Sequence, residues 1–135
     1  MNLVRLVYCS KAKQEISPEL VEDILVVARK ENTKNQITGV LGRTSWYFLQ
    51  FLEGNYKEVN QLLVNIAGDD RHDEFTLLEY RAISRRQFPG WSMLFIEDKE
   101  NITRLFERYL SDTGYLEINH FADASVNYLK KAAIN

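Results

Sequence analysis

The 135-residue sequence is poor in cysteine and has no long apolar run. Its single cysteine, Cys9, excludes an internal disulfide, so we expect a reducing, cytoplasmic environment. Cys9 lies in an apolar segment, which favours a buried, unreactive thiol over a nucleophile. No stretch approaches the roughly 20 apolar residues of a membrane-spanning helix, and the N-terminus lacks the basic and apolar segments of a signal peptide. We therefore expect no membrane partner.

An excess of positive charge is also missing. The chain has 17 basic and 19 acidic residues, a formal net charge of −2, so there is no electrostatic reason to expect nucleic acid. Arg81, Arg85 and Arg86 are close in sequence, but acidic neighbours offset them, and such a run is typical of a solvated face. We also expect no metal site.

The apolar pattern predicts one domain built from alternating strands and helices. Ser17-Pro18-Glu19 has an N-cap residue, proline at the first helical position and an early acid, and predicts a helix that ends near Glu31-Asn32. Gly54-Asn55 opens a second helix with apolar residues on one face. Near-continuous or alternating apolar runs predict strands, at residues 3–9, 37–41, 47–52, 75–83 and 91–96.

The resulting order, β-α-β-β-α-β-β, predicts an α+β protein with a ferredoxin-like sheet and both helices on one face. We assign residues 1–97 to this domain. Residues 98–135 predict two further helices, the second starting near Asp123. We expect this extension to cover the other face of the sheet or to mediate self-association.

Polar side chains inside apolar strands are the strongest functional signal. Gln50 lies mid-strand, where a buried amide must satisfy both donors and acceptors. Tyr8 lies in the first strand, which neighbours the third in the expected sheet, so Tyr8 and Gln50 can meet. Asn32 is expected just beyond the first helix, where a C-terminal cap is an equal alternative. For Gln50 and Tyr8 the alternative is ordinary core structure.

Both predicted helices carry an isoleucine on the face toward the sheet, Ile24 and Ile66. A flat apolar ring with a polar rim, such as isoalloxazine, would fit between these side chains and an amide at its edge. The same isoleucines could instead pack against one another.

Several short motifs together resemble the BLUF family, blue-light sensors that use flavin. The resemblance runs from about Leu3 to Ile96, and its order and spacing are specific although each motif alone is weak. The matching segments are residues 5–10, 28–32, 37–41, 48–54, 69–72 and 88–93.

The resemblance implies a role for each matched position. Tyr8 would donate an electron and a proton to the photoexcited flavin, and Gln50 would bridge the Tyr8 hydroxyl to the flavin edge. Asn32 would bind the carbonyl and imide side of the ring, while Ile24 and Ile66 would sandwich it. The rearranged Gln50 amide would carry the signal and return thermally in the dark.

Two further groups follow from the same resemblance. Residues expected near Gln50, relaying its change to the fifth strand, are Ser10, Trp91 and Met93. Residues expected at the ring edge or the ribityl chain are Asp69, Arg71 and His72. Arg43 and Asn65 depart from the common family pattern, which leaves the phosphate end open. FAD is the expected flavin, with FMN and riboflavin as alternatives.

The sequence thus predicts a blue-light photoreceptor and not an enzyme. Because about 40 residues follow the sensor, we expect a stand-alone protein that forms a homo-oligomer and signals to a separate downstream protein. The alternative is a small ferredoxin-like monooxygenase or isomerase. Such an enzyme needs a general base in its pocket, and the two histidines, His72 and His120, lie outside the apolar strands.

Overall fold

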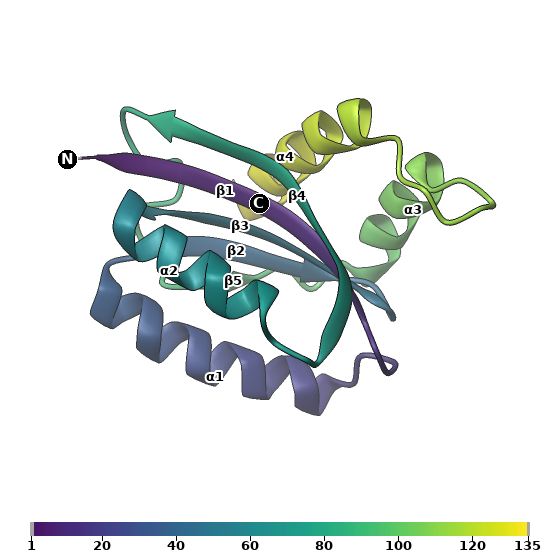
Figure 1. The fold of residues 1–135 in the computed structure, drawn as a ribbon, viewed down its shortest axis with the longest axis horizontal. Coiled ribbons are helices and arrows are strands. Elements are labelled where there is room, and N and C mark those ends of the chain that lie inside the picture. Colours follow the sequence, from purple (N-terminus) through teal and green to yellow (C-terminus); the bar gives the residue numbers. More distant parts are fainter. Residues whose placement is uncertain (1, 135) are drawn as a thin grey trace.

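The computed structural model describes residues 2–134 as one sheet with helices on both faces (Figure 1). Within this range the strands are β1 (Leu3–Ala12), β2 (Thr38–Arg43), β3 (Tyr47–Asn55), β4 (His72–Ile83) and β5 (Leu94–Phe95). The helices are α1 (Pro18–Asn35), α2 (Tyr56–Ala67), α3 (Lys99–Tyr109) and α4 (Ile118–Ile134). Helices α1 and α2 cover one face of the sheet, and α3 and α4 lie on the other.

The strand order is β4-β1-β3-β2-β5, which confirms the predicted ferredoxin-like arrangement with one added edge strand. β1 lies antiparallel to both β3 and β4, and β5 lies parallel to β2. The register places Tyr8 directly opposite Gln50. Gly39 permits the close approach of β2 and β3, because a Cβ there would lie 2.4 Å from the carbonyl oxygen of Phe51.

Helix α1 begins as predicted and ends later. The Ser17 hydroxyl accepts a hydrogen bond from the amide of Leu20, 3.1 Å away, and Pro18 is the first helical residue. The predicted end near Asn32 is wrong, since the helix continues to Asn35 and Gln36 caps it with a left-handed φ of 56°. Of the polar residues at this end, Glu31, Thr33 and Lys34 are exposed on a continuing helix, whereas Asn32 faces inward. Asn32 is therefore a buried helical residue and not a residue beyond the helix.

The fifth strand is shorter than predicted and α4 is longer. Of residues 91–96 only two form β5, because the carbonyl groups of Ser92 and Met93 accept hydrogen bonds from side chains of α1 instead of a strand. Helix α4 starts at Ile118, five residues before the expected Asp123. Its early turns contain Phe121, which is fully buried and holds that end of the helix on the core.

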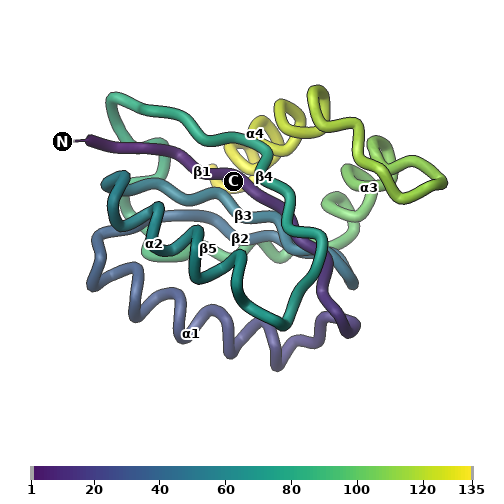
Figure 2. Tube along the Cα trace, in the orientation of Figure 1, coloured from purple at the N-terminus to yellow at the C-terminus, as the bar shows by residue number. Residues whose placement is uncertain are grey.

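The segment between β4 and β5 crosses from one edge of the sheet to the other (Figure 2). The fully buried Glu53 carboxylate accepts hydrogen bonds from the backbone amides of Gln87 and Phe88. The Arg86 guanidinium donates to Thr38 Oγ1 and to two carbonyl groups nearby. These bonds fasten the crossing segment to β2 and β3.

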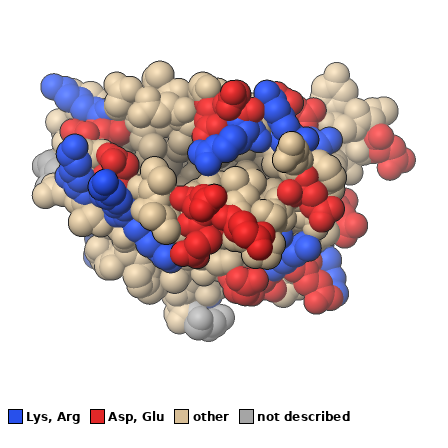
Figure 3. Space-filling view, turned by 90° about the horizontal axis from the view of Figure 1, so that it is seen from below, with Lys and Arg blue, Asp and Glu red and all other residues tan. Residues whose placement is uncertain are grey.

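The surface seen from below the view of Figure 1 carries both signs of charge (Figure 3). Acidic side chains gather near its centre, with basic ones both beside them and toward the sides, so this face has no extended basic surface for a nucleic acid. Between residues 2 and 134, none of the helices combines the length and apolar character needed to cross a bilayer.

Candidate functional site

A cavity of about 360 Å³ lies between the sheet and helices α1 and α2. Its volume falls in the range of small-molecule sites. Apolar and polar side chains of the two helices form its walls, and strand residues form its floor. The floor includes Tyr8 from β1, Leu41 from β2, and Phe48 and Gln50 from β3.

Tyr8 and Gln50 meet on the floor of this cavity. The Tyr8 hydroxyl donates a hydrogen bond to Gln50 Oε1, and the two residues are 5% and 6% exposed. Gln50 Nε2 lies 3.6 Å from Met93 Sδ, a weak acceptor. Burial raises the pKa of the Tyr8 phenol, with smaller contributions from Asp69 and Cys9. Tyr8 therefore keeps its proton at neutral pH.

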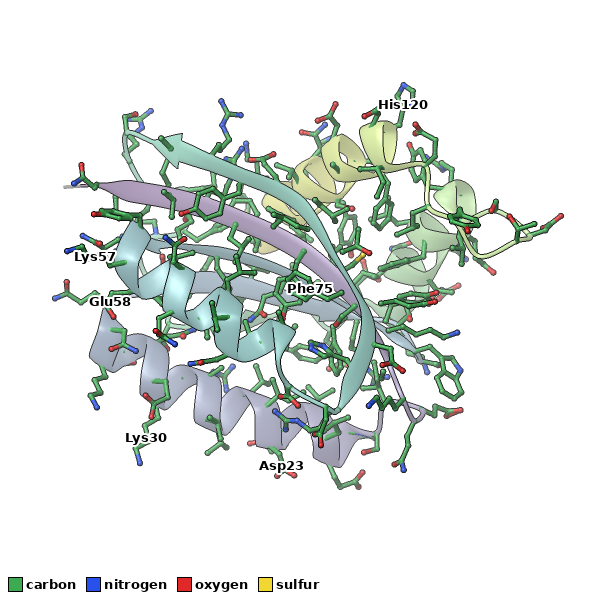
Figure 4. All side chains as sticks on the ribbon, viewed as in Figure 1. Asp23, Lys30, Lys57, Glu58, Phe75 and His120 are labelled. Atoms are coloured by element: carbon green, nitrogen blue, oxygen red, sulfur yellow. The ribbon has the colours of Figure 1, made fainter. Side chains whose placement is uncertain are left out.

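Phe75 supports this pair from the neighbouring strand, pointing from β4 into the space beside the helices (Figure 4). Its ring stacks on Tyr8 with centroids 4.8 Å apart. The sequence placed Phe75 at the start of a strand without assigning it to the site. Its position opposite β1 depends on the irregular register between β1 and β4, which no local pattern reveals.

Asn32 lies in the cavity wall and connects it to the segment before β5. Its Nδ2 donates to the Ser92 carbonyl oxygen at 2.7 Å. One turn earlier, Arg29 Nε donates to the Met93 carbonyl oxygen at 3.1 Å. Through these two bonds helix α1 positions Met93, whose side chain contacts Gln50. Arg29 belongs to a motif matched by the sequence, but its role was not assigned there.

Ile24 of α1 and Ile66 of α2 both line the cavity, from opposite helices. Each is partly buried and packs against the core on this face of the sheet. Both side chains therefore border the same space between the helices and the sheet.

The turn after α2 supplies the polar rim. Asp69, Arg71 and His72, the first residue of β4, all line the cavity. The expectation that both histidines lie outside the strands is therefore wrong for His72. Asp69 accepts from the Arg71 guanidinium at 2.6 to 3.1 Å, and this bonding lowers the pKa of the Asp69 carboxyl. His72 lies between Ser10 Oγ at 2.8 Å and the Ile66 carbonyl oxygen at 2.6 Å.

Two residues expected near Gln50, Ser10 and Trp91, have other partners. Ser10 is fully buried and contacts His72, not the amide. The Trp91 side chain is 39% exposed and packs beside Phe88 at a centroid distance of 6.2 Å. The Trp91 carbonyl oxygen accepts a 3.0 Å bond from the Gly39 amide of β2. Met93 alone of the three contacts Gln50.

These residues fit the chemistry of a flavin. The helices offer apolar walls for the ring, while Tyr8, Gln50 and Asn32 offer a donor, an amide and a second amide for its polar rim. Within residues 2–134 no cluster of His, Cys, Asp and Glu is suited to a metal ion.

Comparison with known proteins gives the family. Residues 3–94 match the BLUF family, described as sensors of blue light using FAD. This chain belongs to the BLUF family of blue-light flavin sensors. The flavin resemblance stated from the motifs is thereby confirmed at the level of the family.

Two curated relatives illustrate the range of the family. The beta subunit of photoactivated adenylate cyclase from Euglena longa is 30% identical over 94 residues, which are 68% of this chain and 11% of the relative. The blue light- and temperature-regulated antirepressor BluF of Escherichia coli (strain K12) is 29% identical over 70 residues, 52% of this chain and 17% of that protein. The chain thus spans about a tenth to a sixth of these relatives.

Solved structures of similar length also match. BlsA in its photo-activated state superposes with a TM-score of 0.77 and 32% identity, covering 95% of this chain and 94% of BlsA. BlrB, a BLUF protein in its dark state, gives a TM-score of 0.69 and 27% identity, covering 99% and 98%. These proteins lend no support to the monooxygenase or isomerase alternative.

Proposed function

We propose that this chain senses blue light by rearranging the hydrogen bonds of Tyr8 and Gln50 at the edge of a bound flavin. The observation that carries the proposal is the bond from the Tyr8 hydroxyl to Gln50 Oε1 on the floor of a cavity of small-molecule size. Membership of the BLUF family supports the same function.

Different cavity residues would contact different parts of the flavin. Ile24 and Ile66 would contact the two faces of the ring, and Asn32 would bind its carbonyl and imide side. Asp69 and Arg71 would meet the ring edge or the ribityl chain. FAD is the flavin named in the family description and the one we propose, although FMN and riboflavin share the ring that these residues would contact.

A bound flavin supplies the absorption of blue light and an electron-accepting ring. Tyr8 would provide the electron, and its hydroxyl proton would pass to Gln50 Oε1, the atom it already contacts. The buried phenol keeps its proton in the dark because desolvation penalises the phenolate. After the electron and proton return to Tyr8, the light state would differ from the dark state in the orientation of the Gln50 amide.

Gln50 has two partners on opposite sides, so a turn of its amide has consequences for both. A half-turn exchanges Oε1 and Nε2, which replaces the bond from Tyr8 and alters the contact with Met93 Sδ. Met93 immediately precedes β5. We propose that Met93, together with Ser10 and the Trp91 backbone, relays the change to this edge of the sheet.

The output is proposed to be a protein contact. We infer that the chain acts in the cytoplasm, associates with itself and signals to a separate protein through the region that includes residues 98–135. The buried free thiol of Cys9 is consistent with a reducing environment. Light scattering coupled to size-exclusion chromatography tests self-association, and a single protomer mass in darkness and light at high concentration would contradict it.

The direct test is an absorption spectrum of the purified protein before, during and after blue illumination. We expect yellow protein, a small red shift of the flavin bands in light, and recovery in darkness. Protein that takes up neither FAD, FMN nor riboflavin would refute the proposal. If the protein binds flavin but its absorption bands do not shift in light, the proposed flavin binding stands and the proposed light sensing is refuted.

A further inference from the structure

His72 joins two walls of the cavity that are distant in sequence. Its imidazole lies between Ser10 Oγ on β1, at 2.8 Å, and the Ile66 carbonyl oxygen in the last turn of α2, at 2.6 Å. Ser10 is two residues from Tyr8 on the same side of β1, and the Ile66 side chain lines the cavity. One ring thus contacts both the strand of the proposed donor and the helix that covers the cavity.

The partner on α2 determines which ring nitrogen carries the proton. A carbonyl oxygen can only accept, so Nε2 must donate to Ile66. In the neutral ring Nδ1 then has no hydrogen and accepts from the Ser10 hydroxyl. In the protonated ring Nδ1 donates to Ser10 Oγ, and the hydroxyl hydrogen must turn to another acceptor. The bridge persists in both states, but the direction of its Ser10 bond reverses.

We propose that His72 is a positioning residue of the photoreceptor. Its protonation state would set the direction of the Ser10 hydroxyl, two residues from Tyr8 on β1, and thereby the rate of return to the dark state. The inference rests on the proposed function, because it concerns the recovery of the same Tyr8–Gln50 pair. Ser10 is fully buried, so water cannot compensate when its hydrogen changes direction. His72 would act through Ser10 and Tyr8, and not by contacting the reacting atoms.

Several other titratable and charged groups lie around His72, and a change in their charge could also alter the recovery rate. On β1 the nearby phenol is Tyr8, whose raised pKa keeps it neutral throughout the test range. In the preceding turn Asp69, whose carboxyl is influenced by His72, is paired with Arg71. Charged groups farther out are Asp23 of α1 and Asp70, which act on Arg71, and the Lys13–Asp73 pair. The lowered pKa of Asp69 and the raised pKa of Arg71 keep the Asp69–Arg71 pair charged across pH 5–8.

The chain contains two histidines, so a matched control exists. His120 lies on α4 and points away from the sheet (Figure 4), where Nδ1 contacts exposed Glu117 at 2.7 Å. His72→Gln keeps a donor for Ile66 and an acceptor for Ser10 but cannot titrate. Ser10→Ala leaves the histidine and removes its partner on β1. His120→Gln removes the other titrating ring.

The measurement is the rate of dark recovery of the flavin bands from pH 5 to 8, the range in which histidine changes charge. For the wild type and for His120→Gln we expect one inflection and a rate change of about 2- to 10-fold, the effect of gaining or losing one hydrogen bond on the path to the transition state. His72→Gln and Ser10→Ala should each recover at a rate independent of pH.

A flat wild-type profile would overturn the inference without reference to any variant. An inflection that survives in either His72→Gln or Ser10→Ala would also overturn it, and so would an inflection lost in His120→Gln. If one of the two bridge variants fails to retain flavin, the other still decides. Absence of any light-induced shift in the wild type would refute the proposed function instead, so the two failures are distinguishable.

Discussion

The two faces of the sheet use the same strands for opposite purposes. On the α1 and α2 face, the strands meet a cavity with buried polar groups such as Tyr8 and Gln50. On the α3 and α4 face, Phe51, Phe121 and Leu129 are fully buried in a packed apolar cluster. Because side chains alternate along a strand, each strand contributes to both.

Adjacent residues of β1 show what the difference teaches. Burial raises the pKa of both the Tyr8 phenol and the Cys9 thiol, the latter to about 12. Only Tyr8 faces a partner that can exchange one hydrogen-bonding atom for another. Burial alone therefore leaves the Cys9 thiol unreactive. The Tyr8 phenol is also buried, but it lies beside the Gln50 amide, whose orientation can change. The packed face would hold the strands in register while the open face changes.

The largest expected effect is on the open face, from Gln50→Leu and Tyr8→Phe. Each removes one side of the hydrogen bond between the two residues while keeping side-chain volume similar. We expect complete loss of the light-induced red shift with flavin retained, measured by difference spectra of purified protein. Gln14→Leu, at an exposed glutamine, should keep the full shift. A normal shift in either site variant would show that this face does not contain the switch.

Leu129→Ala tests the packed face. Leu129 is fully buried in the apolar cluster, so its truncation should lower the free energy of unfolding by about 2–5 kcal/mol. Urea denaturation measures this loss, and the folded fraction should still shift under blue light. Leu77→Ala, at a 45% exposed leucine, should change stability by about 0.5 kcal/mol or less. Loss of the shift in folded Leu129→Ala would contradict the separation of the two faces.

Asn32→Ala probes the join between α1 and the segment before β5. The substitution leaves the Ser92 carbonyl without its 2.7 Å donor, which should cost about 1–3 kcal/mol of stability. Flavin affinity should also fall, since the amide in the cavity wall is lost. Titration with FAD and urea denaturation measure the two effects. Unchanged flavin affinity would remove Asn32 from the binding residues.

Ser125→Ala is the opposite experiment on the packed face. Ser125 Oγ is buried and, among the described residues, has no hydrogen-bond partner. Replacing it removes an unsatisfied polar group, so we expect stability to rise by about 1 kcal/mol. A rise in the urea midpoint with an unchanged slope would confirm this, whereas a fall would show that the hydroxyl has a partner in solution.

The smallest effect concerns pH at the rim of the cavity. The bond with Arg71 lowers the pKa of the folded Asp69 carboxyl, so its stabilisation is present above the unfolded value of about 3.9 and disappears as pH falls through the folded pKa. Arg71 is more than half exposed, so solvent screening limits the contribution to about 0.5 kcal/mol. Unfolding midpoints from pH 6 to 2 should decline slightly less in Asp69→Asn than in the wild type.

The elements predicted best were those with local signals. Ser17 and Pro18 mark the start of α1, and Asn55 caps α2 through a bond from the Lys57 amide, because capping depends on neighbours in sequence. The end of α1 and the length of β5 were wrong. The length of β5 depends on bonds from Arg29 and Asn32 to residues about 60 positions away, which no local pattern contains, whereas α1 ends at the left-handed cap of Gln36.

The sequence by itself indicated the family, the ferredoxin-like sheet and that Tyr8 and Gln50 could meet on neighbouring strands, because apolar periodicity and short motifs are visible along the chain. The register that places the two residues directly opposite each other came from the structure. The tertiary structure alone decided that Met93 rather than Trp91 reaches Gln50, and that His72 bridges Ser10 and α2. These contacts depend on how a crossing segment and a turn pack against the sheet. Such packing is set by the whole fold, since each bond joins elements that only the folded chain brings together.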